Sequence, residues 1–162
     1  IGAEKAHTTS RVHSLEFRAI SAVFGHLGLE LDLTLCSQSE LQLIKQAVDW
    51  HKKFRGLLHS GDSVRFDCES ESQISHGVYS QNRDEALVSL VQLTETKQGA
   101  DSQFLRLPGL DSDRRYRVVA FDSKLATTHA VGEYTGQQLS TTGLKVSEMS
   151  PETGTIFHLL SI

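Results

Sequence analysis

Residues 24–33, FGHLGLELDL, combine the local signals that decide the fold of the N-terminal part of this chain. Gly25 and Gly28 mark the end of a helix, because a terminating residue often needs a positive φ, which glycine tolerates. The alternation of leucine with acidic residues over 29–33 predicts a short strand. Since helical patterns flank this strand on both sides, the stretch indicates the helix–strand–helix rhythm of an α/β barrel or a doubly wound sheet.

The segments on either side have the periodicity of amphipathic helices. Residues 14–24, SLEFRAISAVF, predict a helix with a wide apolar stripe, and Ser14 is placed to cap its first turn. The next helix begins at Ser37, which forms a capping box with Glu40 three residues later. Its apolar positions follow the 3.6-residue period as far as Leu58. We therefore expect the helical part to end near residue 58.

Beyond residue 58 the helical periodicity stops, and turn signals separate short β-rich runs. The run over 86–94, ALVSLVQLT, is apolar on both faces for part of its length, as in a strand covered on both sides. The other expected strands are 63–67, 75–80, 104–107, 116–122 and 155–160. Six or more short strands with regular turns predict an antiparallel β-sandwich over residues 59–162.

The composition is that of a soluble globular protein, with 162 residues, 38% hydrophobic and 22% charged. A net charge of −4 without a basic run argues against a nucleic-acid partner, and no apolar stretch is long enough for a membrane. Cys36 and Cys68 favour free thiols in a reducing compartment over a disulfide, which indicates the cytoplasm. Because the chain starts with Ile1, we expect a fragment of a longer protein.

Few residue patterns point to chemistry. Glu30 and Asp32 share one face of the predicted strand, where a barrel carries its active site, but Asp32 lies close to the next helix and more readily hydrogen-bonds the turn there, so a structural role is favoured over a catalytic one. The histidines show neither HxH nor HExxH spacing, so no metal site is predicted. GxSxG, P-loop and GxGxxG motifs are absent from the sequence.

Several linked motifs nevertheless resemble the C-terminal part of family 36 α-galactosidases. Residues 1–11, IGAEKAHTTSR, are similar to a family loop written HVSxxPNHQxxR, with His7 on the histidine of NHQ and Arg11 on the closing arginine. Leu15 and Arg18 match PLxxR, and the opening stretch matches FGNLGYELDL. Later, GDSVRF, RLPGLDSDRRYRV and YTGQQLSTTGL look like GDxYRL, LxGLDPxxxYxV and YSGxxLMxxGL.

The resemblance covers essentially the whole chain, with departures at a few motif positions. Lys5 and Ala6 replace Pro-Asn, Ser14 replaces the proline of PLxxR, and His26 replaces an asparagine. These departures indicate a divergent subgroup. The implied fold is mixed α+β and mainly β: residues 1–58 hold the last elements of a (β/α)₈ barrel, with two helices around a short strand, and residues 59–162 hold the antiparallel β-sandwich.

The resemblance also implies the reaction. The family is retaining and uses two aspartates about 5 Å apart, and in the family both lie before the segment where this chain starts. The implied parent removes terminal α-galactose from raffinose- or melibiose-type oligosaccharides without cofactor or metal, and this chain is expected to be inactive alone. His7 and Arg11 are the substrate-proximal candidates, since they follow a barrel strand on the active-site face.

A second reading stays open beside the enzyme fragment. A β-sandwich also suits a non-catalytic carbohydrate-binding module or a homo-oligomerisation module. A sugar-binding face needs exposed aromatic rings, for which Tyr79, Tyr116 and Tyr134 are the candidates; Trp50 lies on a helix and more readily packs in the core. A purely structural sandwich that braces the barrel is the third alternative.

Overall fold

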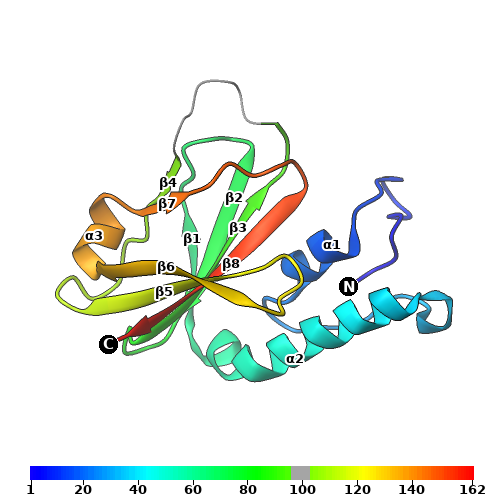
Figure 1. The fold of residues 1–162 in the computed structure, drawn as a ribbon, viewed down its shortest axis with the longest axis horizontal. Coiled ribbons are helices and arrows are strands. Elements are labelled where there is room, and N and C mark those ends of the chain that lie inside the picture. The colour runs from blue at the N-terminus through cyan, green and yellow to red at the C-terminus, as the bar shows by residue number, and fades with distance from the viewer. Residues whose placement is uncertain (96–102) are drawn as a thin grey trace.

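The computed structural model describes residues 1–95 and 103–162 (Figure 1). Two helices come first, and a β-rich part follows that contains one short further helix. In chain order the elements are α1 Leu15–Ala22, the 3₁₀ turn Leu33–Leu35, α2 Gln38–Ser60, β1 Asp62–Phe66, β2 Gln73–Tyr79, β3 Glu85–Gln92, β4 Gln103–Leu105, β5 Arg115–Phe121, β6 Thr128–Thr135, α3 Gly136–Thr141, β7 Leu144–Val146 and β8 Thr153–Ser161. The expected class, helices followed by mainly antiparallel β-structure, is confirmed.

The described strands form two antiparallel sheets. The larger sheet has the order β1-β2-β3-β8-β5-β6, and β4 pairs with β7 in a small second sheet. β3 lies inside the larger sheet and is buried from Ala86 to Gln92, as its two-sided apolar pattern predicts. Successive strand residues point to opposite faces, so the larger sheet has an apolar surface on each side.

Each face of the larger sheet has its own hydrophobic core. On one face the helices α1 and α2 pack against residues that include Leu87, Phe121 and Ile156. Trp50 of α2 lies in this core, with its ring centroid 5.7 Å from that of Phe121. On the other face, β4, β7 and α3 cover residues such as Tyr116. Figure 1 shows α2 along one side of the sheet, with β4, β7 and α3 toward the opposite end of the molecule.

The predicted start of the long helix is confirmed. The Ser37 hydroxyl accepts a hydrogen bond from the Glu40 backbone amide, and the Glu40 carboxylate accepts one from the Ser37 amide. The helical part packs on the sheet, because the apolar face of α2 and the buried side of α1 share one core with it. The helical part and the β-rich part are therefore joined by a continuous apolar contact.

The predicted strand over 29–33 is wrong. Glu30 forms one parallel bridge with Gly2, and the backbone then turns into the 3₁₀ helix that begins at Leu33. Asp32 causes this turn, since its carboxylate accepts hydrogen bonds from the amide and the hydroxyl of Thr34. A period-two pattern becomes a strand only where neighbouring chain pairs with it, and here the pairing stops after one residue.

Three elements of the β-rich part were not predicted: β6, α3 and β7. In β6 the regular alternation is broken by a β-bulge, since Val118 pairs with Gly132 and Val119 with Ala130. Val131 is thereby left without a partner in β5. The helix α3 and the strand β7 are short, at six and three residues, and give little periodic signal.

Candidate functional site

Residues 4–13 fold into a tight hairpin-like loop that carries both sequence-predicted site residues. Lys5 and Val12 form an antiparallel bridge. The amide of Ala6 donates to the Arg11 carbonyl at 2.9 Å, and the amide of Ser10 donates back to the Ala6 carbonyl at 2.9 Å. Ser10 adopts a φ of 57°, which turns the chain at the tip of the loop. These bonds give the loop a defined backbone.

His7 and Arg11 are both exposed on this loop. Within residues 1–95 and 103–162, neither side chain has a hydrogen-bond or ion-pair partner, although the backbone amide of Arg11 donates to the Thr9 hydroxyl oxygen at 3.4 Å. The structure thus places the two residues together on one short loop, with side chains that are available for contacts outside the described residues.

The foot of the loop is held from two directions. Arg18 of α1 donates from Nε to the His13 carbonyl at 3.1 Å and from Nη1 to the Gly2 carbonyl, so one guanidinium spans both sides of the loop. From the β-rich part, Glu152 Oε2 lies 3.3 Å from His13 Nδ1. Sequence reasoning matched Arg18 to a motif but assigned it no role, and it missed His13 and Glu152.

The two acidic residues of the opening stretch have different surroundings. Asp32 caps the 3₁₀ turn, and its hydrogen bonds from Thr34 lower the pKa of its carboxyl group below the ordinary value. Glu30 is exposed beside its single bridge to Gly2. The structural interpretation of Asp32 is therefore confirmed.

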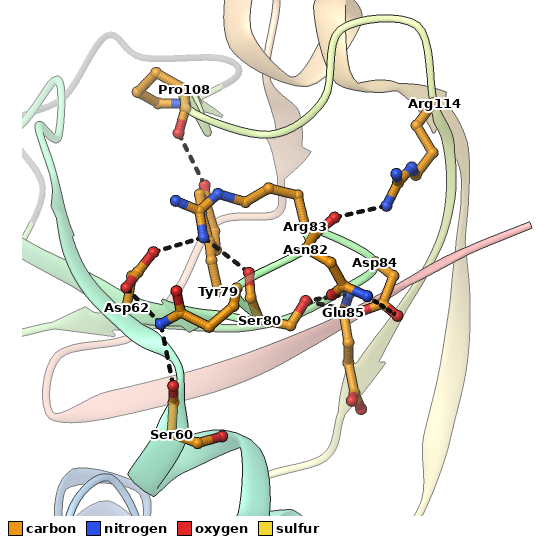
Figure 2. A network of polar contacts seen from close by, with 11 residues as sticks. Ser60, Asp62, Tyr79, Ser80, Asn82, Arg83, Asp84, Glu85, Pro108 and Arg114 are labelled. Atoms are coloured by element: carbon orange, nitrogen blue, oxygen red, sulfur yellow. Dashed lines mark hydrogen bonds and ion pairs between the residues drawn. The ribbon is translucent and has the colours of Figure 1, made fainter.

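A polar network fixes the β2–β3 turn to the end of α2 (Figure 2). The Arg83 guanidinium donates to the Asp62 carboxylate at 2.7 Å, and Gln81 Nε2 donates to Asp62 at 2.8 Å and to the Ser60 carbonyl at 3.2 Å. The Tyr116 hydroxyl donates to the Arg83 carbonyl at 2.7 Å. The charged groups at the centre of Figure 2 point toward one another, so the network serves as an internal brace.

The brace shifts the pKa of its members. The hydrogen bond from Arg83 holds the pKa of Asp62 below its ordinary value, with Gln81 contributing in the same direction. Burial raises the pKa of Tyr79, whose hydroxyl donates to the Pro108 carbonyl at 3.1 Å. Both shifts favour the protonation state that the brace uses, namely an ionised Asp62 and a neutral tyrosine.

A groove of about 550 Å³ lies between β6 and the segment that joins β7 to β8. Its floor includes the buried Phe121 and Phe157, and its rim carries His129, Lys145 and Glu148. These rim side chains have no ion-pair partner in the described part of the chain. The rim supplies one carboxylate, whereas a retaining glycosidase needs two.

The candidates for an aromatic sugar platform lie mostly in the core. Tyr79 and Tyr116 are 1% and 0% exposed, Trp50 is 3% exposed, and only Tyr134 is half-buried. Among residues 1–95 and 103–162, no group of three or more His, Cys, Asp and Glu side chains is arranged to hold a metal ion. Across the same residues, no helix has the length and apolar character that a membrane crossing needs.

Comparison with known proteins decides the family. The sequence model of the glycosyl hydrolase family 36 C-terminal domain matches residues 73–159, and that of melibiase matches residues 1–61. This chain belongs to glycoside hydrolase family 36. The two matches follow one another along the chain in the order that the motif resemblance predicts.

Two curated relatives of the chain are named α-galactosidases. The chain is 29% identical over 174 residues to the alpha-galactosidase of Escherichia coli, a match that covers 98% of this chain and 24% of the relative. It is 30% identical over 153 residues to alpha-galactosidase AgaA of Geobacillus stearothermophilus, covering 94% and 20%. The chain therefore spans about a quarter or less of these two family members.

Two solved α-galactosidase structures agree in fold with this chain. AgaA in complex with raffinose superposes with a TM-score of 0.85 at 28% identity, covering 100% of this chain and 21% of AgaA. The α-galactosidase of Lactobacillus brevis gives a TM-score of 0.83 at 26% identity and the same coverage of this chain. The arrangement of α1, α2 and the antiparallel sheet is thus a family 36 arrangement.

Proposed function

We propose that this chain is the C-terminal part of a retaining α-galactosidase that hydrolyses terminal α-galactosides of the raffinose and melibiose type. The observation that carries the proposal is the full-length similarity to α-galactosidases, with 98% of this chain matched to the Escherichia coli enzyme. Homologous AgaA structures hold raffinose and stachyose, which supports the substrate class.

In this proposal the catalytic carboxylates lie outside the chain. A retaining mechanism needs a nucleophilic carboxylate and an acid/base carboxylate about 5 Å apart. No aspartate or glutamate of this chain is assigned either role. The chain alone is therefore proposed to be inactive, and the two aspartates are proposed to lie in the preceding barrel.

The two parts of the chain have different roles in this proposal. Residues 1–58 complete the catalytic barrel, and residues 59–162 form the sandwich that braces it. The shared core of α1, α2 and the larger sheet supports a bracing role, because it buries the apolar stripe of α2 against the sheet. The free thiols of Cys36 and Cys68 support a cytoplasmic enzyme that needs no disulfide.

His7 and Arg11 are proposed to lie at the rim of the substrate site. Their exposed side chains have no partner among the described residues, while the backbone between them is hydrogen-bonded. Such a loop can present an imidazole and a guanidinium to sugar hydroxyls without a large loss of loop entropy on binding.

The experiment substitutes loop residues in the full-length enzyme. We expect His7→Ala and Arg11→Ala to lower kcat/KM for raffinose by about 10-fold each, as the loss of one charged or polar hydrogen bond of about 1.4 kcal/mol predicts. Thr8→Ala is the matched control, since Thr8 is exposed at the same turn. Unchanged kcat/KM in both test variants would remove the loop from the substrate site.

A further inference from the structure

The β-rich part reaches the loop that carries His7 and Arg11. The start of β8 lies beside α1, as Figure 1 shows. Gly154 permits this approach, because a Cβ atom at that position would lie 3.0 Å from the Ile20 side chain. The residues just before β8 are thereby placed next to the foot of the 4–13 loop.

Glu152 contacts the foot of the loop from the β-rich part. Its Oε2 atom lies 3.3 Å from His13 Nδ1, with the Glu152 and His13 side chains 50% and 23% exposed. The Nδ1 atom itself is buried and forms no hydrogen bond among the described residues, so the contact is one of proximity between a carboxylate and an imidazole nitrogen. The His13 amide donates to the Glu4 carbonyl at 3.2 Å, which closes the base of the loop. Glu152 therefore contacts the residue, His13, whose backbone amide closes the base of the loop.

The backbone at Glu152 adds a second observation. Glu152 has a φ of 55°, a left-handed conformation that glycine adopts more readily than other residues. A side chain at this position destabilises the turn relative to glycine, and the visible contact of that side chain is with His13. The structure thus associates a strained backbone with a contact to the candidate site.

We propose that Glu152 is a positioning residue for the 4–13 loop, acting through His13, so that the β-rich part sets the geometry of the substrate rim. This inference rests on the proposed role of His7 and Arg11 at the substrate. Arg18 fixes the loop from within the helical part, whereas Glu152 contacts it from the residue just before β8.

The test compares Glu152→Gln and Glu152→Gly with Glu148→Gln in the full-length enzyme. Glu148 is the control because it lies on the same segment, is exposed and has no ion-pair partner among the described residues. An exposed ion pair contributes about 0.2–1 kcal/mol, so we expect the Glu152 variants to lower kcat/KM for raffinose by about 1.5- to 5-fold. Glu152→Gly should do so without lowering Tm, because glycine relieves the backbone strain.

Two further readouts separate positioning from a structural effect. In a double-mutant cycle, Glu152→Gly and His7→Ala should be non-additive in kcat/KM, since both act through one loop. Amide hydrogen exchange at Ala6 and Ser10 should be faster in the Glu152 variants and unchanged in the control. Additive effects, or unchanged exchange in the loop, would overturn the inference.

The exchange measurement also separates this inference from the proposed function. A wild-type enzyme without α-galactosidase activity would refute the proposed function, while faster exchange in the loop would still support the positional role of Glu152. Conversely, an active wild-type enzyme with unchanged kcat/KM and unchanged loop exchange in both Glu152 variants would refute the positional role alone.

Discussion

The Tyr116 hydroxyl is the point at which the polar brace can be tested most sharply. The ring is completely buried, and the hydroxyl donates to the Arg83 carbonyl at 2.7 Å and accepts from the Asp111 amide at 3.2 Å. Tyr116→Phe removes both hydrogen bonds and leaves the ring in place. The Tyr79 hydroxyl makes one hydrogen bond, to Pro108, and the Tyr134 hydroxyl makes none among the described residues.

The three tyrosines therefore form a graded series of phenylalanine substitutions. A net contribution of about 1 kcal/mol per hydrogen bond, with a further penalty for groups left unpaired in the interior, predicts a loss of about 2–3 kcal/mol for Tyr116→Phe. The same reasoning predicts about 1 kcal/mol for Tyr79→Phe and about zero for Tyr134→Phe. For a chain of this size, the first loss corresponds to a decrease in Tm of about 4–12 °C.

Urea denaturation of this chain measures the series directly. Trp50 is the only tryptophan and lies in the core between α2 and the sheet, so its fluorescence reports unfolding. The midpoint should decrease in the order Tyr134→Phe, Tyr79→Phe, Tyr116→Phe, with unchanged m-values. A Tyr116→Phe variant as stable as the wild type, or less affected than Tyr134→Phe, would show that the brace does not stabilise the fold.

Two other changes test the interior and the acid sensitivity of the fold. Ser75 and Ser89 are both buried, but the Ser75 hydroxyl donates to the Ser89 carbonyl at 2.8 Å, whereas the Ser89 hydroxyl has no partner among the described residues. Ser75→Ala should lower the free energy of unfolding by about 1 kcal/mol and Ser89→Ala should leave it unchanged or raise it; equal losses in urea melts would contradict this difference. Because Arg83 lowers the pKa of Asp62, ionised Asp62 stabilises the fold above its unfolded-state pKa, and this contribution is lost as the pH falls through the folded-state pKa. Asp62→Asn should therefore destabilise the chain at neutral pH, with a difference from the wild type that shrinks as the pH falls through the folded-state pKa of Asp62, and a difference that does not change with pH would refute the assignment.

Local sequence signals predicted the elements whose formation depends on residues close to them in the sequence. The capping box at Ser37 and Glu40 depends on four consecutive residues and was predicted correctly. The strand β3 was predicted from its continuous apolar run. By contrast, the leucine alternation over 29–33 failed, since strand formation there depends on pairing that extends only to the Gly2–Glu30 bridge.

The candidate site was only partly accessible from the sequence. His7 and Arg11 came from the family resemblance, because two exposed polar residues on a loop carry no local signature of their own. The contact between His13 and Glu152 joins residues from opposite ends of the chain, so no motif or residue spacing predicts it. A glutamate at a φ of 55° becomes visible only when the backbone is known.

Hydrolysis of p-nitrophenyl α-galactoside by this chain and by its full-length parent tests the central claim most directly. We predict activity in the parent alone, because the chain spans 24% or less of the α-galactosidases described above and the two catalytic aspartates are proposed to precede it. Hydrolysis by the chain itself would place the catalytic carboxylates within residues 1–162, and inactivity of the parent would contradict the proposed reaction.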